Sequence, residues 1–109
     1  MTVRLLCEKC GFEAISLPTP DRDIDGVYIG DLLSWVMGRA EADNVWITIM
    51  TNVNIVAVAT LADVSCILLA EGVRPDGEIV ELAKAKGVNV LKTPLSAYEA
   101  AITVSESFK

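Results

Sequence analysis

Histidine is absent from this chain of 109 residues. Because histidine is the commonest general base and the usual activator of serine and cysteine nucleophiles, its absence argues against most hydrolytic mechanisms. Gly-rich phosphate loops are missing too, since neither GxGxxG nor GxxxxGK(S/T) occurs, and no dinucleotide or P-loop triphosphate site can be read from the sequence. We therefore expect a protein that is not an enzyme and carries no cofactor.

Cysteine and basic residues are also scarce. The three cysteines, an odd number, fit a reducing compartment rather than a disulfide framework. The nine lysines and arginines are scattered among 15 acidic residues, which leaves a net charge of −6. This balance argues against nucleic-acid binding, which draws on clustered positive charge. The acidic pairs Asp21 with Asp23 and Glu41 with Asp43 lie in polar stretches, where we expect them to be solvated.

No hydrophobic run reads as a membrane span. Residues 53–70 contain a single charge, Asp63. The pattern changes around this residue from an alanine-containing helical run to a β-branched run, which favours a buried helix followed by a buried strand. The N-terminus has too short an apolar segment for a signal peptide and includes Glu8. We therefore expect a cytoplasmic protein without membrane association, with one domain over residues 1–109.

Hydrophobic periodicity and turn residues predict an α/β fold. Thr2 begins a helix that ends at Gly11, a short strand follows over 12–17, and Val27–Ile29 form a second strand before the helix LLSWVMGRA. Strands and helices then alternate, with strands at 45–50, 65–70 and 88–92 and helices at 54–62, 76–86 and 95–107. Strands separated by helices imply right-handed parallel crossovers with helices on both faces. The predicted architecture is three-layer α/β/α with a mainly parallel sheet.

The apolar stripes of two helices predict which side chains are buried. In the helix that Asp31 is expected to cap, the core positions are Leu33, Val36, Met37 and Ala40. In the last helix, which begins at Thr93-Pro94 or at the capping box Ser96–Glu99, they are Leu95, Tyr98, Ile102 and Phe108. Trp35 falls off its stripe and is either an interface anchor or partly buried within the monomer. The apolar content of 52% is high for a small soluble chain and predicts a homodimer as the simplest partner.

Polar residues follow the predicted parallel strands at the edge where their carboxyl ends meet. Ligands of such sheets bind at this edge, where loops and helix N-termini present unpaired backbone N–H groups. The candidate binding residues there, which could hold an anion or a polar small molecule, are Thr51, Asn52, Asn54 and Arg74. The same residue types are ordinary in strand-to-helix turns and caps, so purely structural roles are the alternative.

Cys7 and Cys10 form a CxxC pair near the end of the first predicted helix. Redox pairs of this kind lie at a helix start instead, where the helix N-terminus lowers the thiol pKa. A tetrahedral zinc site needs four ligands, and one chain offers only Cys66 besides this pair. A metal or iron–sulfur site would therefore need two chains to share their pairs. Packing along the apolar stripe with Val3 and Leu6 is the simpler interpretation.

Several short motifs occur in an order that resembles one family across nearly the whole chain. They are YIGDLLS, WITI, NIVAVA, ILLAEG with the following RPD, and VLKTPLSAYE. In this order and spacing they resemble the DRTGG domain family. The resemblance implies a fold like the N-terminal domain of HPr kinase/phosphorylase, a tendency to dimerise and a regulatory role, beside CBS domains in some pyrophosphatases. Stand-alone members accompany iron-only hydrogenase genes, which implies a protein partner in a redox or hydrogenase system. The family carries no catalytic residues.

The chain departs from this family at its named motif. The Asp-Arg pair belongs in the turn after WITIM, where this sequence has Thr51 and Asn52. The Thr-Gly-Gly belongs after ILL, where it has Ala70, Glu71 and Gly72, which adds Glu71 and Gly72 to the candidate edge. The pair Asp21-Arg22 lies in an earlier turn and is not the motif. Loss of the arginine and gain of Glu71 disfavour anion binding unless Arg74 compensates.

Overall fold

The computed structural model describes residues 1–109 and contains five helices and five strands. In chain order they are α1 (Val3–Cys10), β1 (Glu13–Ser16), β2 (Val27–Ile29), α2 (Leu33–Arg39), β3 (Val45–Thr48), α3 (Asn54–Ala62), β4 (Cys66–Leu69), α4 (Gly77–Lys86), β5 (Val90–Lys92) and α5 (Ala97–Ser107). Every predicted element is present, and its ends differ from the predicted ones by at most two residues. None of the helices is long and apolar enough to cross a lipid bilayer.

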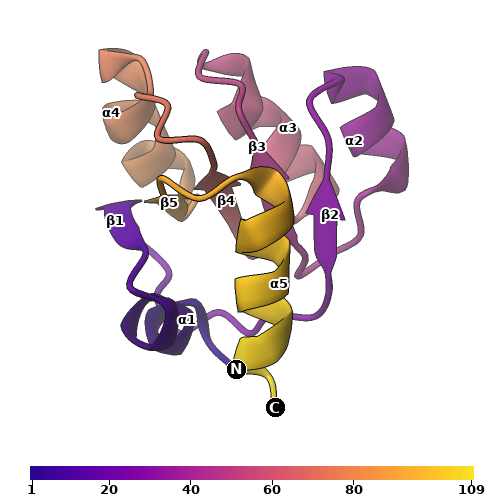
Figure 1. The fold of residues 1–109 in the computed structure, drawn as a ribbon. Helices are drawn as coiled ribbons and strands as arrows, with labels where there is room; N and C mark the ends of the chain where they lie inside the picture. The colour runs from indigo at the N-terminus through magenta and orange to yellow at the C-terminus, as the bar shows by residue number, and fades with distance from the viewer.

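The strands form a single sheet in the order β1-β5-β4-β3-β2. Neighbouring strands from β5 to β2 are parallel, whereas β1 pairs antiparallel with β5 at one edge. The helices α2, α3 and α4, which connect the parallel strands, cover one face, and α1 and α5 cover the other (Figure 1). The predicted three-layer α/β/α architecture with a mainly parallel sheet is thus confirmed.

Alternation along the strands divides the buried side chains into two cores. Trp46 of β3 and Ile67 of β4 pack beneath α2, α3 and α4, whereas Val45 and Cys66 pack beneath α1 and α5. Every side chain of β3 and β4 is buried, as expected for the central strands of a sheet with helices on both faces. The carboxyl ends of the parallel strands are the edge at which sheets of this kind bind ligands.

Two expectations for α2 are wrong. Met37 is 48% exposed instead of buried, because the helix turns Val36 toward the core and places Met37 at its flank. Asp31 does not cap α2, whose N-cap position is Leu32 without a side-chain hydrogen bond. Instead, the Asp31 carboxylate accepts hydrogen bonds from Thr48 Oγ1 at 2.7 Å and from the backbone N–H of Ile49 at 3.0 Å. Asp31 therefore ties the end of β2 to the end of β3.

The predicted buried face of α5 is also wrong. Tyr98, Ile102 and Phe108 are 73%, 36% and 45% exposed, and only Leu95 of the predicted set packs against the core. The side chains that face the sheet are small, namely Ala97, Ala100, Ala101 and Val104. They let α5 lie close over β2 and β3, which leaves the larger apolar side chains outside. The helix begins with the Ser96–Glu99 capping box rather than at Thr93-Pro94.

Candidate functional site

The loops that follow the parallel strands meet at one edge of the sheet. The backbone N–H of Asp76, before α4, donates to the carbonyl of Thr51, before α3, at 3.0 Å. The N–H of Glu71, after β4, donates to the carbonyl of Leu95, after β5, at 2.8 Å. The first bond joins the loops before α3 and α4, which cover the same face of the sheet. The second joins the loops before α4 and α5, which cover opposite faces. The predicted edge exists, and its backbone groups are largely paired with each other.

The asparagines at this edge have turn and cap contacts. Asn52 Oδ1 accepts a hydrogen bond from the backbone N–H of Asn54 at 2.9 Å, which supports the first turn of α3. Thr51 and Asn52 are half-buried, and Asn54 is exposed. Asn52 therefore has the structural role that the sequence offered as the alternative to binding. The Asn54 side chain is exposed to solvent.

Glu71 and Gly72 form a tight turn after β4. Both residues have positive φ, +60° and +67° respectively, and the N–H of Val73 donates to the carbonyl of Ala70. Two successive left-handed residues define a type I′ turn, which favours glycine at both positions. Glu71 is a non-glycine residue in a conformation that costs an L-residue about 1 kcal/mol. Glu71 therefore occupies a backbone position that glycine would adopt without this cost.

No cavity lies among these edge residues. The three hollows of the surface are elsewhere: about 350 Å³ between α3 and α4, about 400 Å³ between the ends of α1 and α5, and about 340 Å³ along α5. The edge is an open polar surface on which Arg74 is exposed and takes part in none of the ion pairs. Arg74 is therefore available to bind an anion, but no pocket would enclose that anion.

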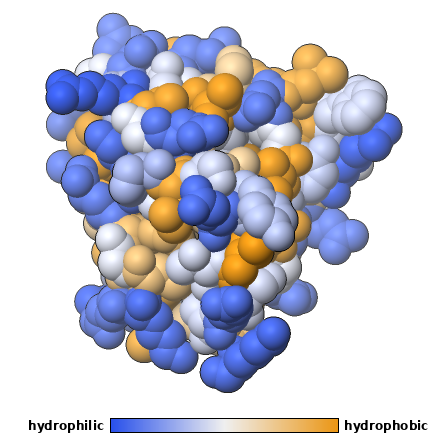
Figure 2. All heavy atoms as spheres, viewed as in Figure 1, coloured by the Kyte–Doolittle hydropathy of each residue, from blue (hydrophilic) through white to orange (hydrophobic).

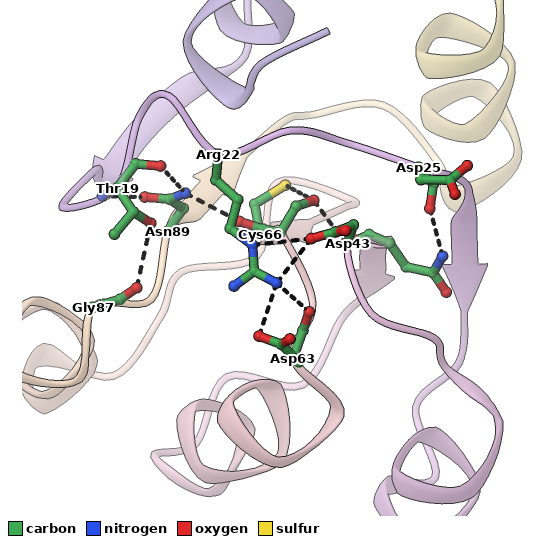
Figure 3. A network of polar contacts seen from close by, with 10 residues as sticks. Thr19, Arg22, Asp25, Asp43, Asp63, Cys66, Gly87 and Asn89 are labelled. Carbon is green, nitrogen blue, oxygen red and sulfur yellow. Dashed lines mark hydrogen bonds and ion pairs between the residues drawn. The ribbon is translucent and has the colours of Figure 1, made fainter.

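A polar network at the opposite, amino edge of the sheet escaped the sequence prediction (Figure 3). Arg22 donates to the carboxylates of Asp43 at 3.0 Å and Asp63 at 2.8 Å, and also to the backbone carbonyl of Asp63. Partial burial alone would lower the pKa of the Arg22 guanidinium, but the bonds to Asp43 and Asp63 outweigh it and raise that pKa. Asp43, expected to be solvated, is thus paired and half-buried.

Asn89 extends the same network into the protein interior. Its side-chain oxygen accepts from the N–H of Thr19 at 3.0 Å, and its nitrogen donates to the carbonyls of Thr19 and Ser65 at 2.8 and 3.0 Å. Asn89 is 1% exposed, so these bonds replace contacts with water. Arg22 and Asn89 together fasten the segment before β2 to the amino ends of β4 and β5. Every buried side-chain polar atom has a partner, which indicates a structural role rather than a binding site.

The cysteines pack against the core beneath α1 and α5. Cys7 and Cys10 are half-buried at the end of α1, and Cys66 is fully buried in β4. Burial, with the neighbouring Cys10, raises the pKa of the Cys7 thiol, and burial raises that of Cys10. No three His, Cys, Asp or Glu side chains cluster so as to hold a metal ion within one chain. Raised thiol pKa values are the opposite of those in redox-active pairs.

Burial raises the pKa of the Cys66 thiol from about 9 to about 12, so the fold should weaken in alkali. Between these values the unfolded chain binds fewer protons than the folded one, and the free energy of unfolding must fall as pH rises. At pH 10.5 the loss through this group is about 2 kcal/mol. Urea denaturation at pH 8 and pH 10.5 should therefore show a larger pH effect in the wild type than in Cys66→Ala. Equal pH effects in the two proteins would contradict the burial of this thiol.

One side of the molecule carries several large apolar side chains that are exposed. Trp35 of α2 is 53% exposed, and Arg39 lies over its ring at 3.9 Å from the centroid. Figure 2 shows separate apolar patches near α2 and over α5, with polar and neutral residues between them. We call this region the β2 surface and define it by the exposed side chains Ile29, Leu32, Trp35, Ile49, Tyr98 and Ile102. About half of Trp35 is exposed, which fits both alternatives that the sequence left open for it, and α5 contributes two residues that the sequence predicted to be buried.

Comparisons with known proteins agree with this architecture. The profile of the DRTGG domain matches residues 21–107 of the chain. A crystal structure of the CBS and DRTGG domains of the regulatory region of Clostridium perfringens pyrophosphatase, complexed with the activator diadenosine tetraphosphate, superposes with a TM-score of 0.75 and 20% identity. The alignment covers 97% of this chain and 46% of that one, so this chain spans about half of its length. No curated protein sequence matches the chain.

Proposed function

Because this chain belongs to the DRTGG domain family, we propose that it is a non-catalytic regulatory module that acts in the cytoplasm by binding other proteins. The observation that carries this proposal is the β2 surface. Its six large apolar side chains are between 36% and 73% exposed, whereas the loop edge where such folds bind small ligands holds no cavity. Exposed aromatic and aliphatic anchors of this kind are typical of protein interfaces.

The absence of catalytic groupings supports the same proposal. The chain has no histidine, and burial raises the thiol pKa of Cys7, Cys10 and Cys66. Nucleophilic cysteines need the opposite shift, toward the thiolate. The carboxylates of Asp31, Asp43 and Asp63 are engaged by structural donors. These three side chains hold the fold together, so they are not available for acid–base chemistry.

The resemblance to stand-alone family members indicates which protein partners to test first. Such members accompany iron-only hydrogenase genes, so we propose a component of a hydrogenase system as the partner to examine. Within one chain no three His, Cys, Asp or Glu side chains cluster as metal ligands. Its contribution would be to bind and to regulate.

An affinity experiment tests the protein-binding role. Immobilised wild-type protein should retain a component of a native extract, or a purified hydrogenase subunit, about ten-fold or more better than Trp35→Ser, since interface hot spots of this size are typical for tryptophan. Leu5→Ser is the matched control, because Leu5 is 39% exposed on α1, outside the β2 surface. Equal retention by the wild type and both variants would contradict the proposal.

A second candidate function is a small-molecule sensor for a nucleotide or another anion. It is favoured by the nucleotide activator in the solved structure of similar fold and by Arg74, which is exposed at the loop edge without an ion pair. A bound nucleotide would place phosphate beside Arg74 and the first turn of α3, where backbone N–H groups favour negative charge.

Thermal unfolding distinguishes this candidate. Diadenosine tetraphosphate, ATP, AMP and acetyl phosphate should be tested with the wild type and with Arg74→Ala. A ligand at about 100 times its Kd would add about 2.7 kcal/mol of stability and raise the Tm by roughly 10 °C. Unchanged Tm values with all four compounds would contradict the sensor role.

A further inference from the structure

We infer that two copies of this chain join through antiparallel pairing of their β2 strands, which continues the sheet across the pair. This inference rests on the proposed protein-binding role and names the first occupant of the β2 surface as a second copy. The two edges of the sheet, β1 and β2, differ in how they are protected. Sheet edges offer unpaired backbone groups, and monomeric proteins blunt them.

The β1 edge is blunted in three ways. Its register shifts between Ala14 and Ser16, which marks a bulge or irregularity. Its first residue, Glu13, is exposed and charged, and Pro18 follows the strand closely. Bulges, charges and prolines are the devices that prevent a further strand from adding to an edge. The β1 edge is thus unsuited to pairing.

The β2 strand is only three residues long, and short length is itself a protection, but it lacks the other three. Val27–Ile29 carries no charge, no proline and no bulge, and it pairs in regular register with β3. The carbonyl of Gly26 accepts from Val45 and the N–H of Gly30 donates to Ile47, so even-numbered residues turn their backbone groups toward β3. By the alternation of a parallel ladder, Val27 and Ile29 turn theirs outward. The outward groups form a row that is ready to pair with another strand.

This row is complementary to itself. When two β2 strands run antiparallel about a two-fold axis through Tyr28, Val27 of each copy lies opposite Ile29 of the other. Each such pair exchanges both backbone hydrogen bonds. The same surface patch then serves on both copies, as a two-fold interface requires. A second copy therefore satisfies all the outward groups of β2.

Apolar side chains flank this strand on both faces of the sheet. α2, with Leu32 and Trp35, lies at the β2 side on one face, and α5, with Tyr98 and Ile102, contacts β2 on the other (Figure 1). Continuing the sheet would bring α5 beside its copy and α2 beside its copy. The hollow of about 340 Å³ along α5, lined partly by Tyr98, Ala101 and Ile102, offers space for side chains of the second α5.

Charge also favours this face for a second copy. Each chain carries a net charge of −6, so two copies repel wherever their carboxylates face each other. The six residues that define the β2 surface are uncharged. Like charges approach at the ends of the strand, because the same register places Asp25 opposite Asp31 of the other copy.

Sedimentation equilibrium of the full chain tests the pairing with two substitutions. Ile29→Pro removes an outward N–H, and proline is tolerated on an edge strand at such a position. It should weaken dimerisation about 100-fold or more, whereas Ile29→Val, which keeps the N–H and the branched side chain, should dimerise nearly as the wild type does. Circular dichroism confirms that each variant folds.

Asp25→Lys tests the register without depending on Ile29→Pro. It replaces two repulsive approaches by attractive ones and should tighten the dimer about ten-fold at low salt. A wild type that stays monomeric at millimolar concentration, an Ile29→Pro dimer of wild-type affinity, or an Asp25→Lys dimer that is not tightened would overturn the inference. The affinity experiment with Trp35→Ser measures the binding of other proteins, and these experiments measure dimerisation. The proposed function and the dimer can therefore be refuted independently.

Discussion

Replacing Val104 by aspartate is expected to leave the chain unfolded, or to lower its free energy of unfolding by about 4 kcal/mol or more. Val104 is fully buried where α5 crosses the sheet and belongs to the core beneath α1 and α5. A carboxylate there would lose its water without gaining a partner. Because a domain of this size is stable by only about 5–15 kcal/mol, the loss is a large share of the total. Urea denaturation with circular dichroism measures it.

Ile102→Asp on the same helix is the matched control. Ile102 is 36% exposed on the outer side of α5, so its substitution should change monomer stability by about 1 kcal/mol or less. The comparison is made at low protein concentration, where dimerisation does not contribute. If Ile102→Asp proved as damaging as Val104→Asp, the orientation of α5 described above would be wrong.

Asn89→Ala should give the second large effect. It removes three hydrogen bonds to the backbone of Thr19 and Ser65 at a position that is 1% exposed. Leaving such groups without partners costs about 2–4 kcal/mol in total, which lowers the Tm by roughly 10–20 °C for a domain of this length. Differential scanning calorimetry provides the measurement.

Asn52→Ala separates this effect from the loss of an ordinary turn asparagine. Asn52 makes one side-chain hydrogen bond, to the N–H of Asn54, and is half-buried. We expect its removal to cost about 1 kcal/mol or less. Similar losses of stability in Asn52→Ala and Asn89→Ala would show that the amino-edge network does not fasten the segment before β2.

The sheet and its crossovers could be predicted because their signals are local. The span from Val45 to Gly72 reads as a buried strand, an uncharged helix and a second buried strand, and β3, α3 and β4 lie there. Burial on both faces of a parallel strand demands a continuous apolar run, so composition and periodicity suffice. The same holds for α1, whose cap residues Thr2 and Gly11 occupy their predicted positions.

The face of α5 could not be predicted, because the helix is apolar on more than one side. Choosing the largest apolar side chains as the core placed Tyr98 and Ile102 inside, whereas the structure buries Ala100 and Val104. How closely a helix approaches the sheet decides between such faces, and that distance depends on its packing against the sheet and α1, which the sequence of α5 alone does not reveal. The error is informative, because the rejected apolar side became part of the β2 surface.

The candidate loop edge was predicted in position but not in detail. Parallel strands bring their carboxyl ends together, so Thr51, Asn54 and Arg74 follow from the strand order alone. The network of Arg22 and Asn89 joins residues distant in sequence, and no local pattern signals such pairing. Asp31 looked like a helix cap because capping residues precede helices, yet its partner Thr48 is at the end of another strand.

Hydrogen exchange of the β2 backbone tests most directly whether the protein binds its partners through the β2 surface. The account predicts that the amides of Val27 and Ile29 exchange quickly in dilute solution and become protected as the concentration of the protein rises, while the amide of Gly30, bonded to Ile47, changes little. Fast exchange of Val27 and Ile29 at every concentration, with added partner proteins as well, would contradict the account.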